Sequence, residues 1–163
     1  MKIEEEILKR LSVEFEGAFR RVAHAAGQLD DGQFWQRPSP KSNSVGIILQ
    51  HLTGNLKQWV GESLGGLEYK RDRPLEFEDG RRKPKDEMLT DFANLGRTVQ
   101  DVISKVSRDS LLSPRHIQGS EETVLSALLH AATHLNLHSG QITYIAKLIL
   151  NEKYAESARH TTP

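Results

Sequence analysis

The chain has 163 residues, which is long enough for one domain with a sizeable hydrophobic core. Its 22 Lys and Arg balance its 22 Asp and Glu, so the formal net charge is zero. A neutral chain lacks the broad positive field of proteins that hold nucleic acid through its phosphates. The absence of cysteine excludes disulfides, thiolate nucleophiles and Cys-ligated zinc. Any bound metal must therefore be held by nitrogen and oxygen.

The N-terminal stretch MKIEEEILKR carries acidic residues where a signal peptide needs an uninterrupted apolar run. No stretch approaches the roughly 20 apolar residues that span a bilayer. We therefore expect a cytoplasmic protein that binds neither membrane nor nucleic acid.

Two amphipathic helices are predicted in the first 60 residues. Apolar side chains recur every three or four residues over 3–29 and again over 45–60, which is the spacing of one buried helix face. Residues 30–44 contain one glycine and two prolines and break this pattern. The second helix is expected to end within the glycine-containing stretch 61–66.

A polar connection, LEYKRDRPLEFEDGRRKPK, follows the second helix. At roughly 20 residues it is much longer than the usual loop between helices. We interpret it as a crossover that joins two helices which are not simple antiparallel neighbours, with a secondary role in shaping a pocket rim.

Two further helices are predicted, at 85–106 and from Ser120 to about 150, with a loop at 107–119 between them. The sequence shows no convincing strand pattern. The predicted fold class is all-α, a four-helix bundle with a long crossover connection between helices 2 and 3. We expect residues 1–150 to form this one domain and residues 151–163 to form a flexible C-terminal tail.

Three histidines of the fourth helix are spaced four residues apart. His138 occupies a position that the helical period assigns to the core, where a buried imidazole needs polar partners. His134 lies about 40° further round the helix, and His130 about 40° beyond that, on the outer face. The pair His134 and His138 can converge on one ion. His130 is expected at the solvent edge or behind a metal ligand.

A catalytic zinc site usually takes three protein ligands and leaves one position open. His51 is the best candidate for the third, because it lies at the margin of the apolar face of the second helix and at the matching height in a bundle. A histidine at such a margin more often satisfies only a carbonyl or a water. The pattern alone leaves both interpretations open.

The chain resembles the DinB/YfiT-like superfamily in two segments, SVGIILQHLTGNLKQWV and LLHAATHLNLHSGQITYIAKLI. The paired histidines followed by Gly-Gln are the more specific motif. The resemblance implies a bundle with a long crossover and a divalent metal, Zn, Ni or Fe, held by His51, His134 and His138. It also implies a homodimer. Some relatives transfer low-molecular-weight thiols such as bacillithiol, mycothiol or glutathione, and others are described as metal-dependent hydrolases.

The expected chemistry is that of a metal-dependent enzyme acting on a small-molecule substrate. No Asp or Glu is predicted on the inward helix faces beside the three histidines, so no general base is assigned. This slightly favours transfer of a thiol cosubstrate to an electrophile over hydrolysis of a small ester or amide. A non-catalytic metal-binding dimer is the other alternative. Asn55 and Gln141 are predicted to contact substrate or to orient a metal ligand.

Overall fold

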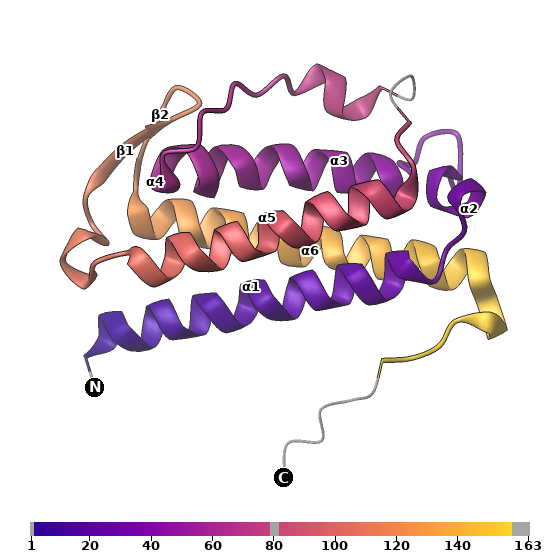
Figure 1. Cartoon of the computed structure of the whole chain (residues 1–163), viewed down its shortest axis with the longest axis horizontal. Coiled ribbons are helices and arrows are strands. Elements are labelled where there is room, and N and C mark those ends of the chain that lie inside the picture. The colour runs from indigo at the N-terminus through magenta and orange to yellow at the C-terminus, as the bar shows by residue number, and fades with distance from the viewer. Residues whose placement is uncertain (1, 79–81, 158–163) are drawn as a thin grey trace, which may run out of the picture.

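The computed structural model describes residues 2–78 and 82–157. Four long helical segments lie side by side (Figure 1). They are α1 (Ile3–Gly27), α3 (Val45–Leu56), α5 (Lys85–Lys105) and α6 (Val124–Leu150). Segment α3 continues directly into the π-helix η1 (Lys57–Glu62) and the short α4 (Ser63–Gly65). The shorter pieces are α2 (Asp31–Trp35) and the 3₁₀ turns η2 (Pro74–Phe77), η4 (Arg108–Ser110) and η5 (Asn151–Lys153).

Side-chain caps fix where α3 and α6 begin. The Ser44 hydroxyl accepts a hydrogen bond from the backbone N–H of Ile47 at 3.2 Å, which starts α3. Thr123 caps α6 in the same way by accepting from the N–H of Ser126 at 3.1 Å. Each cap satisfies a backbone donor that has no partner inside the helix. The fourth helix therefore starts at Val124, a few residues later than predicted.

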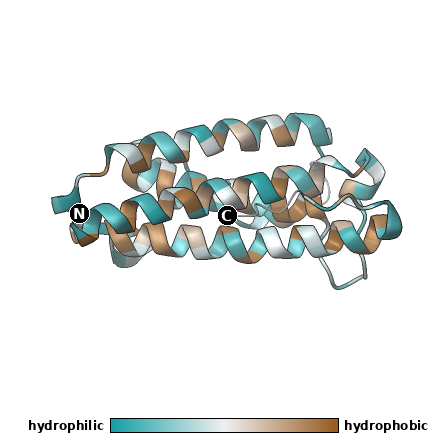
Figure 2. Cartoon of the chain, turned by 90° about the horizontal axis from the view of Figure 1, so that it is seen from below, coloured by the Kyte–Doolittle hydropathy of each residue, from teal (hydrophilic) through white to brown (hydrophobic). Residues whose placement is uncertain are grey.

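The core lies between the four long helices. Helix α1 packs against α5 and α6, and α3 packs against the same two helices from the other side. Hydrophobic and hydrophilic residues interleave along each helix, as expected of amphipathic helices with one buried face (Figure 2). The largest fully buried side chains include Phe15, Leu29, Phe34, Ile47, Leu49, Leu52, Leu56, Leu128, Leu135 and Ile142.

The long connection runs back over the outer side of α3 before it enters α5 (Figure 1). Its 3₁₀ turn η2 packs directly on α3. The backbone carbonyl of Glu76 accepts from the side chain of Gln50 at 3.2 Å, which fastens the turn to the helix. The segment is thus a folded layer over α3, and residues 79–81 within it lie outside the described part of the chain.

The prediction of a purely helical chain was wrong in one region. Strands β1 (Pro114–Ile117) and β2 (Ser120–Thr123) form an antiparallel hairpin in the segment predicted to be a loop and the start of a helix. Gln118 and Gly119 at its tip both have positive φ, 52° and 85°. That geometry suits a two-residue hairpin turn. The strands are four residues long and mostly polar, so their sequence lacks the alternation of hydrophobic and polar residues that predicts a strand.

The beginning of the predicted tail contacts the bundle. The backbone N–H of Ala155 donates to the side chain of Gln28 at 2.8 Å, and its carbonyl lies 2.8 Å from His24 Nε2. Tyr154 packs against the core beside the same histidine. Residues 158–163 lie outside the described part of the chain, so a flexible end stays a prediction there. Among the described residues, no helix has both the length and the apolar character to cross a membrane.

Candidate metal site

The structure brings together the three histidines that the sequence predicted as ligands. His51 projects from α3, while His134 and His138 project from α6, which packs beside it. One ring nitrogen from each lies within 4.8 Å of the other two. The Nε2 atoms of His51 and His134 are 3.1 Å apart. His51 is buried and the other two rings are half-buried, so the group sits at the edge of the core.

Two of the three rings are held from behind by an oxygen acceptor. His51 Nδ1 lies 2.9 Å from a carboxylate oxygen of Glu76, and His138 Nδ1 lies 2.7 Å from the amide oxygen of Gln141. These acceptors cannot donate, so each Nδ1 carries a proton and Nε2 is the nitrogen left to bind a metal. This is how oxygen atoms behind metal-bound histidines fix the tautomer and the ring orientation. Gln141 thus lies behind the imidazole of His138.

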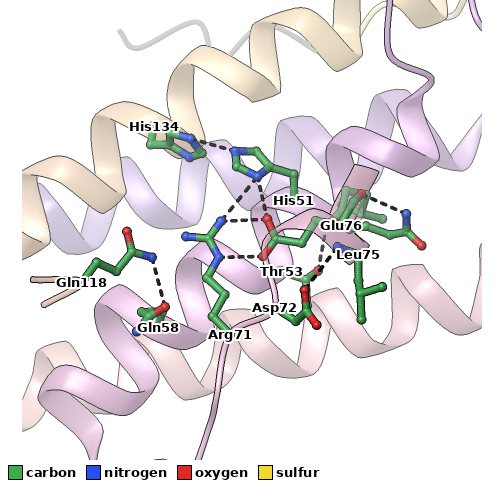
Figure 3. A network of polar contacts seen from close by, with 11 residues as sticks. His51, Thr53, Gln58, Arg71, Asp72, Leu75, Glu76, Gln118 and His134 are labelled. Atoms are coloured by element: carbon green, nitrogen blue, oxygen red, sulfur yellow. Dashed lines mark hydrogen bonds and ion pairs between the residues drawn. The ribbon is translucent and has the colours of Figure 1, made fainter. Parts of the chain in front are cut away.

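Glu76 is itself fixed by Arg71, in a network drawn in Figure 3. The guanidinium donates from Nε to one carboxylate oxygen at 2.6 Å and from Nη2 to the other at 2.8 Å. Both side chains are more than nine-tenths buried. Burial raises the pKa of Glu76, but the hydrogen bonds from Arg71 and His51 outweigh it and hold that pKa below its ordinary value. The carboxylate is therefore ionised beside His51.

Gly54 makes room for this carboxylate. A Cβ atom added at Gly54 would lie 1.9 Å from a carboxylate oxygen of Glu76, so any other residue here would force that carboxylate to move. The glycine sits one turn from His51 on α3. Its small size lets the connection approach α3 closely enough for Glu76 to reach the ring.

Of the three histidines, His134 is the one whose Nδ1 lacks a hydrogen-bond partner among the described residues. This nitrogen is buried. Burial, followed by the nearby rings of His138 and His51, lowers the pKa of His134 to about 3. Burial also lowers the pKa of His138, against the opposing effect of its bond to Gln141. Both rings are therefore neutral near pH 7, which is the state that binds metal.

The donor set fits a divalent cation. The Nε2 atoms of His51 and His134 face each other at 3.1 Å, an approach that is favourable only with a proton or a cation between them. Ligand nitrogens around tetrahedral Zn²⁺ at about 2.05 Å are about 3.3 Å apart. The His51–His134 pair is already close to that spacing, the His138 nitrogen lies within 4.8 Å of both, and three ligands leave a fourth position open. The group can hold a metal ion.

Two other predicted residues lie nearby but outside the three-histidine group. His130 is exposed and stacks on Trp59, with ring centroids 3.8 Å apart. Its ring centroid is 5.8 Å from that of His134. Asn55 is buried, and its Oδ1 has no hydrogen-bond partner among the described residues. Neither contacts His51 through a hydrogen bond that the structure shows.

Sequence reasoning missed Glu76 and Arg71, because it searched the inward helix faces for a carboxylate and found none. Both residues lie in the long connection, where no helical period exists to reveal which side chains turn inward. The available signals were the unusual length of the connection and the mixed charge of RDRPLEFE. These indicated a pocket rim and did not distinguish the buried pair from its exposed neighbours.

Comparison with known proteins places the chain among proteins of this fold. No curated protein matches it. Two crystal structures are similar over nearly their whole length: a conserved protein from Enterococcus faecalis (17% identity, 92% of this chain and 98% of that one, TM-score 0.72) and a DinB-like protein from Bacillus cereus (14% identity, 94% and 97%, TM-score 0.66). At such identities the likeness shows the fold, which is DinB-like.

The family model described as "Protein of unknown function (DUF1572)" matches residues 2–158, almost the entire chain. The match includes the three histidines, the buried pair in the connection and the hairpin. The chain belongs to the DUF1572 family, a DinB-like family.

Proposed function

We propose that the chain binds one divalent metal ion through His51, His134 and His138 and is a metal-dependent enzyme. The observation that carries the proposal is the convergence of one nitrogen from each ring within 4.8 Å, with two rings held from behind by Glu76 and Gln141. Zn, Ni and Fe all accept imidazole nitrogen, so the donor set does not select among them.

Such an ion would supply Lewis acidity, lowering the pKa of a water or thiol at its open position. The protein holds His51 in one orientation through Glu76, and burial lowers the pKa of His134 and of His138, which keeps those two rings neutral. Glu76 contacts the Nδ1 side of the ring, away from the ligand nitrogen, and both its oxygens are occupied by Arg71 and His51. It is therefore a positioning residue and is poorly placed as a general base.

The reaction we favour is transfer of a low-molecular-weight thiol to an electrophilic small molecule. Ionisation of a thiol needs no general base beyond the metal, whereas attack by water on an ester or amide usually uses one. Among the described residues, Glu76 is the one carboxylate that contacts the histidine group. It lies on the Nδ1 side of His51, away from the nitrogen proposed to bind the metal. Hydrolysis of a small ester or amide is the alternative, and a non-catalytic metal-binding protein is the third.

Metal analysis tests the proposal. The purified chain should bind one equivalent of Zn²⁺, Ni²⁺ or Fe²⁺, and His51→Ala or His138→Ala should abolish this. His116→Ala is the matched control, because His116 is exposed on β1 and contacts Glu121 instead. Wild-type protein that binds no metal would overturn the metal site.

A substrate screen then separates the reaction classes. The screen combines bacillithiol, mycothiol and glutathione with a model electrophile, and adds simple esters and amides, with and without metal. Metal-dependent consumption of thiol supports transfer, and metal-dependent ester or amide cleavage supports hydrolysis. A loaded protein inactive on all of them, with a melting temperature that falls markedly on chelation, supports the non-catalytic alternative.

We also propose that the bundle with its long crossover assembles as a homodimer through the outer face of α6. That helix carries one charged residue, Lys147, in 27 residues. Its exposed apolar side chains are Leu129, Leu137, Tyr144 and Leu148. Sedimentation should show a dimer, and Leu137→Glu should dissociate it. Val13→Glu is the control, because it introduces the same charge at an exposed apolar position on α1, and it should leave the dimer intact. A monomeric wild type would contradict this.

A further inference from the structure

A hollow next to the histidine group has the character of a binding site for an anion. Its volume is about 420 Å³, and it is lined by Gln58, Tyr69, Lys70, Arg71, Arg73 and Gln118. The residues come from three elements: the π-helix η1, the long connection that follows it, and the hairpin tip, which is distant in sequence. The histidine pattern did not point to this place.

The lining contains three cations and no carboxylate. Arg71 has its charge met by Glu76, but Lys70 and Arg73 are exposed and add two positive charges. Arg73 lies over the ring of Phe77, with 5.9 Å between its guanidinium carbon and the ring centroid. The intervening Asp72 does not line this hollow; it lines a neighbouring one, which Lys70 also borders, and accepts from the N–H of Leu75 at 3.5 Å.

The hairpin is shaped to complete the hollow. Gln118 has φ of +52°, a left-handed conformation that costs free energy for a residue other than glycine. In this conformation its amide nitrogen donates to the side-chain oxygen of Gln58 at 3.0 Å, across to η1 (Figure 3). Gln58 lies in a π-helix, a rare form found frequently at functional sites. A left-handed residue and a π-helix therefore meet at one wall of the hollow.

Arg71 joins this hollow to the histidine group. The residue lines the hollow, while its Nη2 lies 3.4 Å from His51 Nδ1. In Figure 3 its guanidinium lies between the His51 ring and the Gln58–Gln118 pair. A ligand anchored beside Arg71 is thus one side chain away from the Nδ1 side of His51.

We infer that Lys70, Arg73 and the Gln58–Gln118 pair bind the carboxylate or phosphate group of a small anionic substrate, whose other end reaches the three-histidine site. Cations and amide donors are the groups that recognise both kinds of oxyanion. The assignment of the ligand as a substrate rests on the proposed function. The anion site itself does not, because none of its lining residues is a proposed metal ligand.

Titrations of the metal-free full-length chain test the inference, with succinate in one arm and inorganic phosphate in the other. Binding is followed by backbone amide NMR. We expect saturable shifts at Lys70, Arg73 and Gln118 in at least one arm, and the stronger arm identifies the preferred oxyanion. The variant Lys70→Gln/Arg73→Gln should bind at least about tenfold more weakly. The matched variant Lys9→Gln/Arg10→Gln removes two cations from exposed α1 and should bind as the wild type does.

Two results would overturn the inference: no saturable shift in either arm, or equal weakening by both double variants, which would indicate only diffuse attraction to positive charge. The variant His134→Ala separates the two proposals. It removes a proposed metal ligand that does not line the hollow, so it should lose metal binding and keep anion binding. Retained anion binding in a wild-type chain that takes up no metal would reject the metal site and leave the anion site standing.

Discussion

The two sides of the helical bundle bury different kinds of side chain. Within the described chain, every buried polar or charged residue belongs to α3, its cap, the long connection or α6: Ser44, His51, Asn55, Glu76 and Ser139. The buried faces of α1 and α5 are wholly apolar apart from glycine. Polar groups in a core cost free energy unless they are paired. The comparison indicates that α1 and α5 stabilise the fold while α3, α6 and the connection carry the site.

The long connection contributes to the site side of the bundle by holding a metal-site histidine in place. On the site side, a buried ion pair and a close approach at Gly54 fix one imidazole. Buried ion pairs contribute little net stability, since desolvation offsets their attraction. The role of the Arg71–Glu76 pair here is to orient the His51 ring. Substitutions on the two sides should therefore separate into losses of stability and losses of metal affinity.

The largest expected effect on stability lies on the apolar side. Phe15 of α1 is fully buried, and Phe15→Ala should lower the free energy of unfolding by about 3–5 kcal/mol through lost burial and a cavity. Urea denaturation measures it, and metal bound per folded chain should not change. Val13→Ala, at an exposed position on the same helix, is the control and should cost far less. A loss of metal affinity in folded Phe15→Ala protein would break the comparison.

On the site side, Glu76→Gln should weaken metal binding about 10–100-fold, as loss of an acceptor behind a metal-bound histidine typically does. Competition with a chromophoric chelator gives the affinity. Because this change leaves Arg71 buried without its counter-charge, Arg71→Met/Glu76→Gln should recover stability but not affinity. Glu78→Gln, at an exposed position, is the control. Unchanged affinity in Glu76→Gln would show that the carboxylate does not support the site.

Gly54→Ala sharpens the same point without touching a charged group. The new methyl would collide with Glu76, so the carboxylate should leave His51 and metal affinity should fall in the same direction as in Glu76→Gln, by a smaller factor. Gly140→Ala on α6 is the matched control, since nothing lies within 4 Å of its added carbon. In a helix that change should stabilise by about 0.5–1 kcal/mol. Equal metal affinity in both variants would contradict the close approach.

A pH dependence of the metal-free protein is also expected. His134 has a pKa of about 3 when folded and an ordinary value of 6.5 when unfolded. As pH falls below about 6.5, the unfolded chain takes up the proton first, so stability declines towards pH 3 and is level above about 6.5. Denaturation between about pH 7.5 and 5 avoids the titration of Glu76, whose pKa is lowered from 4.5. His134→Gln should flatten the slope, and a level wild-type profile would contradict the burial of a neutral ring.

The sequence predicted the long helices and the three histidines because both follow the helical period. Apolar residues at steps of three and four located α1, α3, α5 and α6 to within a few residues, and the same period turned His134 and His138 towards the second helix. The period carries no information outside helices. Glu76 and Arg71 in the connection and Gln118 in a short polar hairpin were therefore missed, since tertiary contacts alone decide where such side chains point.

The central claim is that three imidazoles share one metal ion, and X-ray absorption fine structure of the Zn²⁺-loaded chain tests it most directly. We predict one equivalent of zinc with three imidazole nitrogens at about 2.0–2.1 Å and one further light atom. His51→Ala should reduce the imidazole count or abolish binding. A wild-type spectrum with two imidazoles or fewer, or one that His51→Ala leaves unchanged, would contradict the account.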